Sequence, residues 1–297
     1  MNTLGLEIRD SAAAAVAVDD AGAIVARALV ESTGDLASAA LTAVDTVAGT
    51  AGVGALGVAA IQPYASSADA TVAALKQRYS GPFLQHGVSA SGIAAAVGEA
   101  WAGAARGVGD VVFFAVAEHA LAGVVRGGAP MFGGGRRAAS IAWLALNPVE
   151  REDYRKIGCL EAEVAAAGIV RRLIWRIKAG DRSRVADMVG GDLSAITADH
   201  VLKAAREGDG VSISVMRDTA KYLGMAAANL VIVADPEMLV LGGIMATASD
   251  LLTEPVRTEL ARRLPRHTMD ALAIAPAVLG EDAAAIGAAR LTAAALK

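Results

Sequence analysis

A few residues have side chains that could hold a metal ion, act as a general base or contact a ligand. Glu118 and His119 are adjacent, and such a pair could bind a metal or titrate near neutral pH. No second histidine is near them in the sequence, so a surface turn is the favoured interpretation. His86 is a candidate base at the edge of a cleft, or an incidental loop histidine. Glu161 stands just inside an expected helix start, where a carboxylate can contact a ligand or interact with the helix dipole.

Three further features have both a functional and a structural interpretation. Gly242 and Gly243 follow an expected strand and could contact a nucleotide, but a glycine pair also lets a chain leave a strand. The lone cysteine, Cys159, excludes an internal disulfide and a multi-cysteine zinc site, and we expect it to be a small buried residue. A basic run could bind phosphate or DNA, but a solvated helix face is favoured. This run consists of Arg171, Arg172, Arg176, Lys178, Arg182 and Arg184.

The elements that must position these residues form two α/β blocks. The first block is predicted as strands at 4–8, 11–18 and 23–29, a helix at 31–48, a strand at 55–61, a helix at 68–78, a strand at 82–84 and a helix at 91–105. The second is predicted as strands at 110–116, 122–126, 230–233, 238–241 and 272–275, with helices at 159–178, 183–188, 198–206, 211–229, 249–264 and 282–296. We therefore expect lobes at 1–108 and 109–281 around one cleft, with 282–297 packing back on the first lobe.

Length and composition narrow the function further. The 297 residues suffice for two lobes, and a net charge of −4 gives no electrostatic basis for binding DNA or an anionic membrane. The mean hydropathy of +0.46 suggests a membrane protein, but glycine, proline and polar residues interrupt the uncharged stretch 46–68. Glu7, Arg9 and Asp10 interrupt any signal peptide. With a single cysteine, the sequence predicts a cytoplasmic protein.

Several stretches along the chain together form a specific signal of family membership, although each stretch alone is a weak signal. They are 6–8 with 14–16 and 19–22, 94–101 with 103–107, 158–161, 204–209, 228–230, 235–237, 241–243, and Asp282 with 286–289. These stretches resemble the ROK family of bacterial repressors, open reading frames and sugar kinases. The resemblance implies an α/β, two-lobed actin/hexokinase-like (ribonuclease H-like) fold with a central cleft between the lobes.

The positions that would bind ATP, and the position of the base that would take the proton from the sugar hydroxyl, depart from the family pattern. The glycines of the first phosphate loop are replaced by 9–11, which include Asp10, and the G-T-G of the second by 117–119, which include Glu118. The carboxylate of Asp10 would repel a phosphate of ATP. One such like-charge pair at about 4 Å and an effective dielectric of about 20 costs about 4 kcal/mol, which Arg9 could offset. Ser91, or Val88 in another alignment, stands at the catalytic aspartate, and no aspartate lies between 69 and 110. A serine hydroxyl needs a second base to act near pH 7.

The resemblance also implies a zinc site and a sugar site, and both have changed. Trp143 stands for the zinc histidine, Glu152 and Tyr154 stand for two cysteines, and only Cys159 remains of the four ligands. Ser140 replaces a sugar-contacting glutamate, and the family's N-x-P-G-W loop has no counterpart. Of the sugar-contacting set, Glu161 alone is kept.

We therefore expect a non-catalytic ROK protein that senses a ligand or interacts with a protein. The alternative is an ATP-dependent sugar kinase of glucokinase or N-acetyl amino sugar type with a divergent active site; a third is an obligate partner of an active paralogue. We expect no catalytic residue, with Ser91 at the base position, ligand contact by Glu161, and at most weak nucleotide contact by Gly242 and Gly243. No metal or other cofactor is expected beyond weak ATP and Mg²⁺ binding. The expected partners are a small sugar and a second copy of the chain, without membrane or direct DNA binding, because no winged helix-turn-helix precedes the first strand at Leu4.

Overall fold

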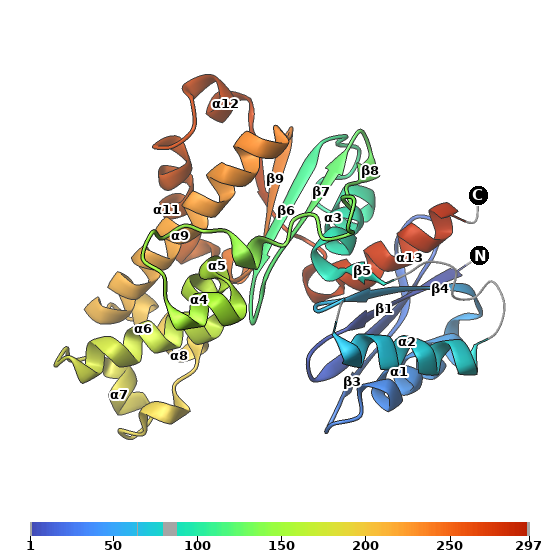
Figure 1. Ribbon diagram of the computed structural model, residues 1–297, viewed down its shortest axis with the longest axis horizontal. Coiled ribbons are helices and arrows are strands. Elements are labelled where there is room, and N and C mark those ends of the chain that lie inside the picture. The colour runs from blue at the N-terminus through green and yellow to red at the C-terminus, as the bar shows by residue number, and fades with distance from the viewer. Residues whose placement is uncertain (1, 64, 80–87, 296–297) are drawn as a thin grey trace.

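The computed structural model describes residues 2–63, 65–79 and 88–295, which contain two five-stranded sheets. The strand orders are β3-β2-β1-β4-β5 and β10-β9-β6-β7-β8. Figure 1 shows one sheet in each lobe, with helices α3 and α13 between the two sheets. We call the part built on β1–β5 the first lobe and the part built on β6–β10 the second lobe.

The first lobe begins with an antiparallel hairpin of β1 (Asn2–Ile8) and β2 (Ala12–Val18), and every residue of β2 is buried. Small side chains allow this strand to be covered on both faces. The other elements are β3 (Ile24–Glu31), α1 (Leu36–Ala51), β4 (Val53–Ala60), α2 (Ser66–Arg78), β5 (Ser89–Ala90) and α3 (Ser91–Ala102). Strand β4 pairs with β1 in parallel. The turn between β1 and β2 therefore lies at the same end of the sheet as the C-terminal end of β4.

The second lobe repeats this plan. Strand β6 (Val111–Val116) forms a hairpin with β7 (Ala120–Arg126) and pairs in parallel with β9 (Met238–Gly243). The remaining elements are β8 (Ala129–Pro130), η2 (Ile141–Trp143), α4 (Glu152–Ile157), α5 (Cys159–Val164), α6 (Ala166–Lys178), α7 (Arg184–Met188), η3 (Leu193–Ala195), α8 (Ala198–Arg206), α9 (Gly210–Ala234), α10 (Ile244–Thr247), α11 (Ser249–Ala261), α12 (Arg266–Ala271), β10 (Ala273–Pro276), η4 (Gly280–Asp282) and α13 (Ala283–Ala295). The first hairpin of each lobe thus has its turn at 9–11 in the first lobe and at 117–119 in the second.

Helices α3 and α13 touch each other backbone to backbone. A Cβ atom on Gly287 of α13 would lie 1.7 Å from the carbonyl oxygen of Ala94 in α3. A Cβ on Gly98 of α3 would lie 2.4 Å from the carbonyl oxygen of Ala283. Only glycine allows such an approach. The two helices are therefore locked together at the level where the lobes join.

Glu99 fastens the segment that leads into α13 to the end of α3. The carboxylate is fully buried and accepts backbone N–H groups from Ala104 at 2.7 Å, Val278 at 3.1 Å and Leu279 at 2.9 Å. Three donors satisfy a buried charge that would otherwise be costly. The side chain therefore has a structural role at the junction of the lobes.

The structure corrects two predictions from the sequence. The predicted strand at 230–233 is the last turn of α9, in which Val231 is buried while Val233 is 83% exposed. Burial at 227, 228, 231 and 234 follows the period of a helix and not of a strand. The predicted helix at 159–178 breaks at Ala165 into α5 and α6. The predicted strand at 82–84 and the candidate base His86 lie outside the described residues.

No helix among the described residues combines the length and the apolarity that crossing a membrane requires.

Candidate functional site

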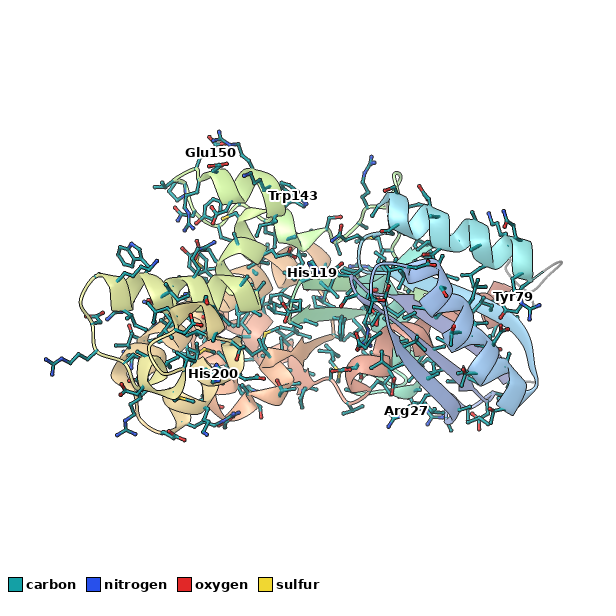
Figure 2. All side chains as sticks on the ribbon, turned by 90° about the horizontal axis from the view of Figure 1, so that it is seen from below. Arg27, Tyr79, His119, Trp143, Glu150 and His200 are labelled. Carbon is teal, nitrogen blue, oxygen red and sulfur yellow. The ribbon has the colours of Figure 1, made fainter. Side chains whose placement is uncertain are left out.

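The two hairpin turns meet at His119, which contacts one carboxylate from each lobe. Its Nε2 lies 2.6 Å from Oδ2 of Asp10 in the turn between β1 and β2. Its Nδ1 lies 3.1 Å from Oε1 of Glu161 in α5. The other oxygen of Glu161 accepts the backbone N–H of Ala120 at 2.9 Å. Figure 2 shows His119 at the junction of the lobes, and we call Asp10, His119 and Glu161 the interlobe triad.

The interlobe triad carries a protonated imidazole at neutral pH. The hydrogen bond to Glu161 raises the pKa of His119 to about 9, against the opposing effect of burial, and the bond to Asp10 adds to the rise. Both ring nitrogens then donate to carboxylates. His119 therefore forms a charged contact between the lobes and is not part of a simple surface turn.

The pH dependence of stability should report this contact. Because the folded pKa of about 9 exceeds the ordinary value of 6.5, the stabilisation is complete below about pH 6.5 and is lost as pH rises through 9. We expect His119→Gln to lower the free energy of unfolding by about 1–2 kcal/mol at pH 6.5, because Asp10 is half exposed and partly screened. Urea unfolding from pH 6 to 10 should show this difference shrinking from about pH 6.5 upward and nearly gone above pH 9.

The matched control is His200→Gln. His200 lies within the second lobe (Figure 2) and closes a capping box with Thr197, which glutamine can also form. The His200→Gln profile should run parallel to that of the unmodified protein. A constant His119→Gln difference across the whole pH range would contradict the charged contact.

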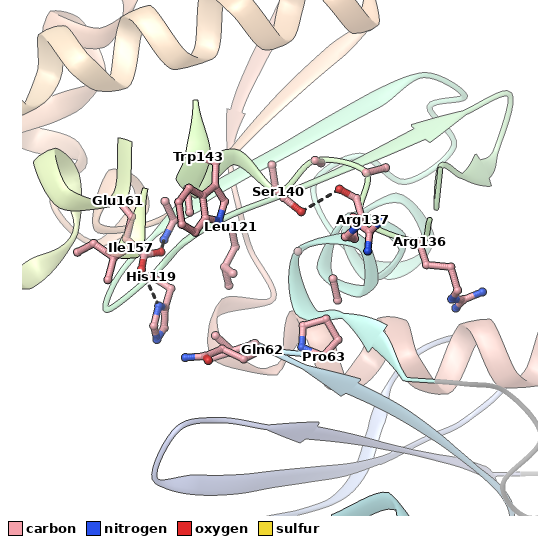
Figure 3. A pocket seen from close by; sticks show the side chains of 18 of the residues that line it. Gln62, Pro63, His119, Leu121, Arg136, Arg137, Ser140, Trp143, Ile157 and Glu161 are labelled. Atoms are coloured by element: carbon pink, nitrogen blue, oxygen red, sulfur yellow. Dashed lines mark hydrogen bonds and ion pairs between the residues drawn. The ribbon is translucent and has the colours of Figure 1, made fainter. Parts of the chain in front are cut away.

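A pocket of about 360 Å³ opens beside the interlobe triad. Its walls are 61–63, 90 and 92 of the first lobe and 119–122, 136–140, 142–143, 156–157 and 161 of the second. Figure 3 shows Trp143, Ile157 and Glu161 together on the wall of the second lobe, with Gln62 and Pro63 across the cavity. The predicted ligand residue Glu161 thus reaches the pocket, and the volume suits a small organic molecule.

The structure places Ser91 next to this pocket. It is fully buried at the start of α3, between the pocket-lining residues Ala90 and Gly92. Within the described part of the chain its Oγ has no hydrogen-bond partner. A hydroxyl without an adjacent base is a weak nucleophile and no general base.

Packing alone is enough to require Gly242 and Gly243. Gly243 has φ +59°, and a Cβ there would lie 2.0 Å from the carbonyl oxygen of Val116. A Cβ on Gly242 would lie 2.9 Å from the Cβ of Ala115. Both glycines therefore let the end of β9 pack on β6, and their contact with a nucleotide stays a prediction.

The four residues that stand for zinc ligands separate in the structure. Tyr154 and Cys159 are buried together against Ala162, as expected for a small apolar cysteine. Glu152 is exposed and pairs with Lys156 at 2.7 Å. Trp143 is 57% exposed at the pocket. Among 2–63, 65–79 and 88–295, no three histidine, cysteine or carboxylate residues cluster as a metal site would need.

Next to Tyr154 lies a buried carboxylate, that of Glu163, which the sequence did not single out. Glu163 is 3% exposed and accepts the hydroxyl of Tyr154 at 2.5 Å and Nη1 of Arg151 at 2.8 Å. Nε of Arg172 lies 3.9 Å from the second carboxylate oxygen. We call these four residues the Glu163 cluster. Nothing in the local sequence distinguishes Glu163 from the exposed glutamates around it, because its partners come from two other helices, α4 and α6, and from the loop before α4.

The basic run extends from α6 to the start of α7, and several of its members pair with other residues of the second lobe. Arg171 pairs with Asp153 at 2.5 Å and Arg176 pairs with Asp181. Arg184 donates to the carbonyl oxygen of Glu207 at 3.1 Å. These partners already neutralise or occupy much of the run, so it gives little support to a patch for phosphate or DNA.

Comparison with known proteins agrees with this architecture. The profile of the ROK family matches residues 4–295. A glucokinase from Halalkalibacterium halodurans is 33% identical over 199 residues, which are 65% of this chain and 59% of that protein, less than two thirds of its length. The DNA-binding transcriptional dual regulator NagC of Escherichia coli is 26% identical over 63% of this chain and 44% of its own.

A solved structure confirms the predicted fold. The ROK family glucokinase from Streptomyces griseus, in complex with glucose and AMPPNP, superposes with a TM-score of 0.80 at 24% identity, over 98% of this chain and 99% of that chain. The predicted two-lobed α/β fold of actin/hexokinase type is therefore correct.

Proposed function

Because the chain belongs to the ROK family, we propose that it binds a small carbohydrate in the pocket beside Glu161 and does not phosphorylate it. In this role the protein is a sensor, and binding changes how the two lobes are held together. The relatives include, by name, glucokinases, a xylose repressor and N-acetylglucosamine repressors, so either a kinase or a regulator is compatible with the family.

The contact between the two hairpin turns is the observation that carries this proposal. The resemblance puts the phosphate loops at 9–11 and 117–119, and Asp10 and His119 of these turns lie 2.6 Å apart. A phosphate chain between the turns would have to break that contact. It would also meet the carboxylate of Asp10, at a cost of about 4 kcal/mol per like-charge pair near 4 Å.

The missing base supports the same conclusion. The hydroxyl group to be phosphorylated must lose its proton to a group within hydrogen-bond reach. The resemblance assigns this role to the position held by Ser91, which is buried and has no partner among the described residues. Removing a general base alone typically slows a reaction by about 10²- to 10⁴-fold.

Turnover assays test the proposal. Purified protein is incubated with Mg-ATP and with glucose, mannose, N-acetylglucosamine or N-acetylmannosamine, and ADP is measured; the Halalkalibacterium halodurans glucokinase serves as positive control. We expect no sugar-dependent ADP above a no-enzyme blank, and calorimetry should show a sugar binding without ATP. Sugar-dependent ADP release would establish the alternative, an ATP-dependent sugar kinase with a divergent active site.

A further inference from the structure

We propose that Trp143 is the platform on which the ring of the bound carbohydrate stacks, with Glu161 accepting hydrogen bonds from the hydroxyls at the ring's edge. This inference rests on the proposed function, because it names the ligand chemistry of the same pocket. It assigns specificity to a residue at which the resemblance implies a metal ligand.

The exposure of Trp143 is the first observation. The indole is 57% exposed although Ile141, two residues earlier in η2, is 3% exposed and anchors this turn in the core. Tryptophan carries a large apolar surface, and leaving it in water forgoes about 25 cal/mol for each Å². A large exposed aromatic side chain that lines a pocket is a typical binding feature.

The backbone beside Trp143 holds the indole in place. Gly158, which precedes α5, has φ +90°, and a Cβ there would lie 2.1 Å from the carbonyl oxygen of Ala142 and 2.9 Å from the nitrogen of Trp143. Only glycine lets the η2 turn approach the start of α5 so closely. The same approach brings Trp143 to the wall that Glu161 occupies, as Figure 3 shows.

The two side chains offer complementary chemistry. An indole face is apolar and electron-rich, so it suits the C–H face of a pyranose ring. Each oxygen of Glu161 uses one acceptor site, for His119 or for the N–H of Ala120, and a carboxylate oxygen has a second. An apolar face next to an acceptor matches a neutral ring with hydroxyls along its edge. The pocket therefore suits a pyranose.

Another exposed tryptophan provides a matched control. Trp175 on α6 is 69% exposed, and it is not among the residues that line the pocket. Trp175→Phe should therefore bind sugar like the unmodified protein. The guanidinium carbon of Arg290 lies 5.2 Å from the ring centre of the third tryptophan, Trp101. Trp101 is kept in all variants.

The experiment combines tryptophan fluorescence and calorimetry, with glucose and N-acetylglucosamine as probes at up to millimolar concentration. We expect sugar to change the emission of the unmodified protein and of Trp175→Phe, and not that of Trp143→Phe. Trp143→Ala should bind about 10-fold more weakly, whereas Trp143→Phe, which keeps an aromatic face, should lose about 3-fold. Thermal unfolding of each variant shows whether it is folded.

Two results would overturn the platform. One is an unchanged affinity in a folded Trp143→Ala variant. The other is the absence of any binding of either sugar to the unmodified protein. The first of these leaves the proposed lack of phosphorylation intact, while sugar-dependent ADP release would refute that proposal whatever Trp143 does.

Discussion

Gly287→Ala is expected to lower the free energy of unfolding by about 3 kcal/mol or more, which is a large part of the about 5–15 kcal/mol typical of a folded chain. The added Cβ would lie 1.7 Å from the carbonyl oxygen of Ala94, 2.5 Å from its carbonyl carbon and 2.9 Å from the nitrogen of Gly98. These atoms belong to the backbone of α3, which cannot yield as a flexible side chain would. The gain in helix propensity, about 1 kcal/mol, is too small to offset the clash.

The matched control is Gly49→Ala, in the helix α1. Gly49 is exposed, and a Cβ there would meet no atom within 4 Å. This variant should be more stable by about 0.5–1 kcal/mol, because alanine has less freedom to lose on folding. Urea unfolding of both variants measures the contrast. If Gly287→Ala were as stable as Gly49→Ala, the backbone contact of α3 with α13 would be wrong.

Glu163→Ala is expected to destabilise the second lobe by about 3–5 kcal/mol, the usual cost of removing one member of a buried ion pair. The variant leaves the hydroxyl of Tyr154 and the guanidinium of Arg151 without the carboxylate that each now contacts. It also leaves the largely buried Arg172, whose pKa is lowered by burial and raised again by Glu163. A buried cation then loses the charge that offsets its desolvation.

Two further variants separate charge from packing at the Glu163 cluster. Glu163→Gln keeps an oxygen for Tyr154, so we expect a smaller loss of about 1–3 kcal/mol. Glu150→Ala removes an exposed ion pair with Arg155 at 3.6 Å and should change stability by no more than about 0.5 kcal/mol. Thermal and urea unfolding provide the measurement. Equal effects of Glu163→Ala and Glu150→Ala would show that the cluster adds nothing to stability.

The family resemblance and much of the secondary structure were accessible from the sequence because they depend on local patterns. Short runs of small apolar residues separated by turns predict the hairpins of both lobes, and helical spacing predicts α3 and α13. Local pattern fails where two patterns compete. The run at 230–233 is rich in β-branched residues, yet the burial of Val231 and Ala234 shows that tertiary packing keeps it in α9.

The candidate site divides in the same way. The acidic replacements in the turns at 9–11 and 117–119, the missing aspartate and the retained Glu161 are visible in the sequence as residue types. That Asp10 contacts His119, 109 positions away, is not, because the pairing depends on how two turns approach across the junction of the lobes. The sequence identifies Trp143 only as the residue at the position of the zinc histidine, and its exposure beside the pocket suggests a contact with ligand.

The sequence by itself determined which residues are present at each position of the ROK pattern, and so which chemical groups are missing. Gly98 and Gly287 also stand in the sequence, as glycines inside helices where they cost about 1 kcal/mol each relative to alanine. Only the tertiary structure shows that these two glycines face each other and that Glu163 is buried among cations. Contacts between distant segments depend on the packing of whole helices, which no local pattern of residues specifies.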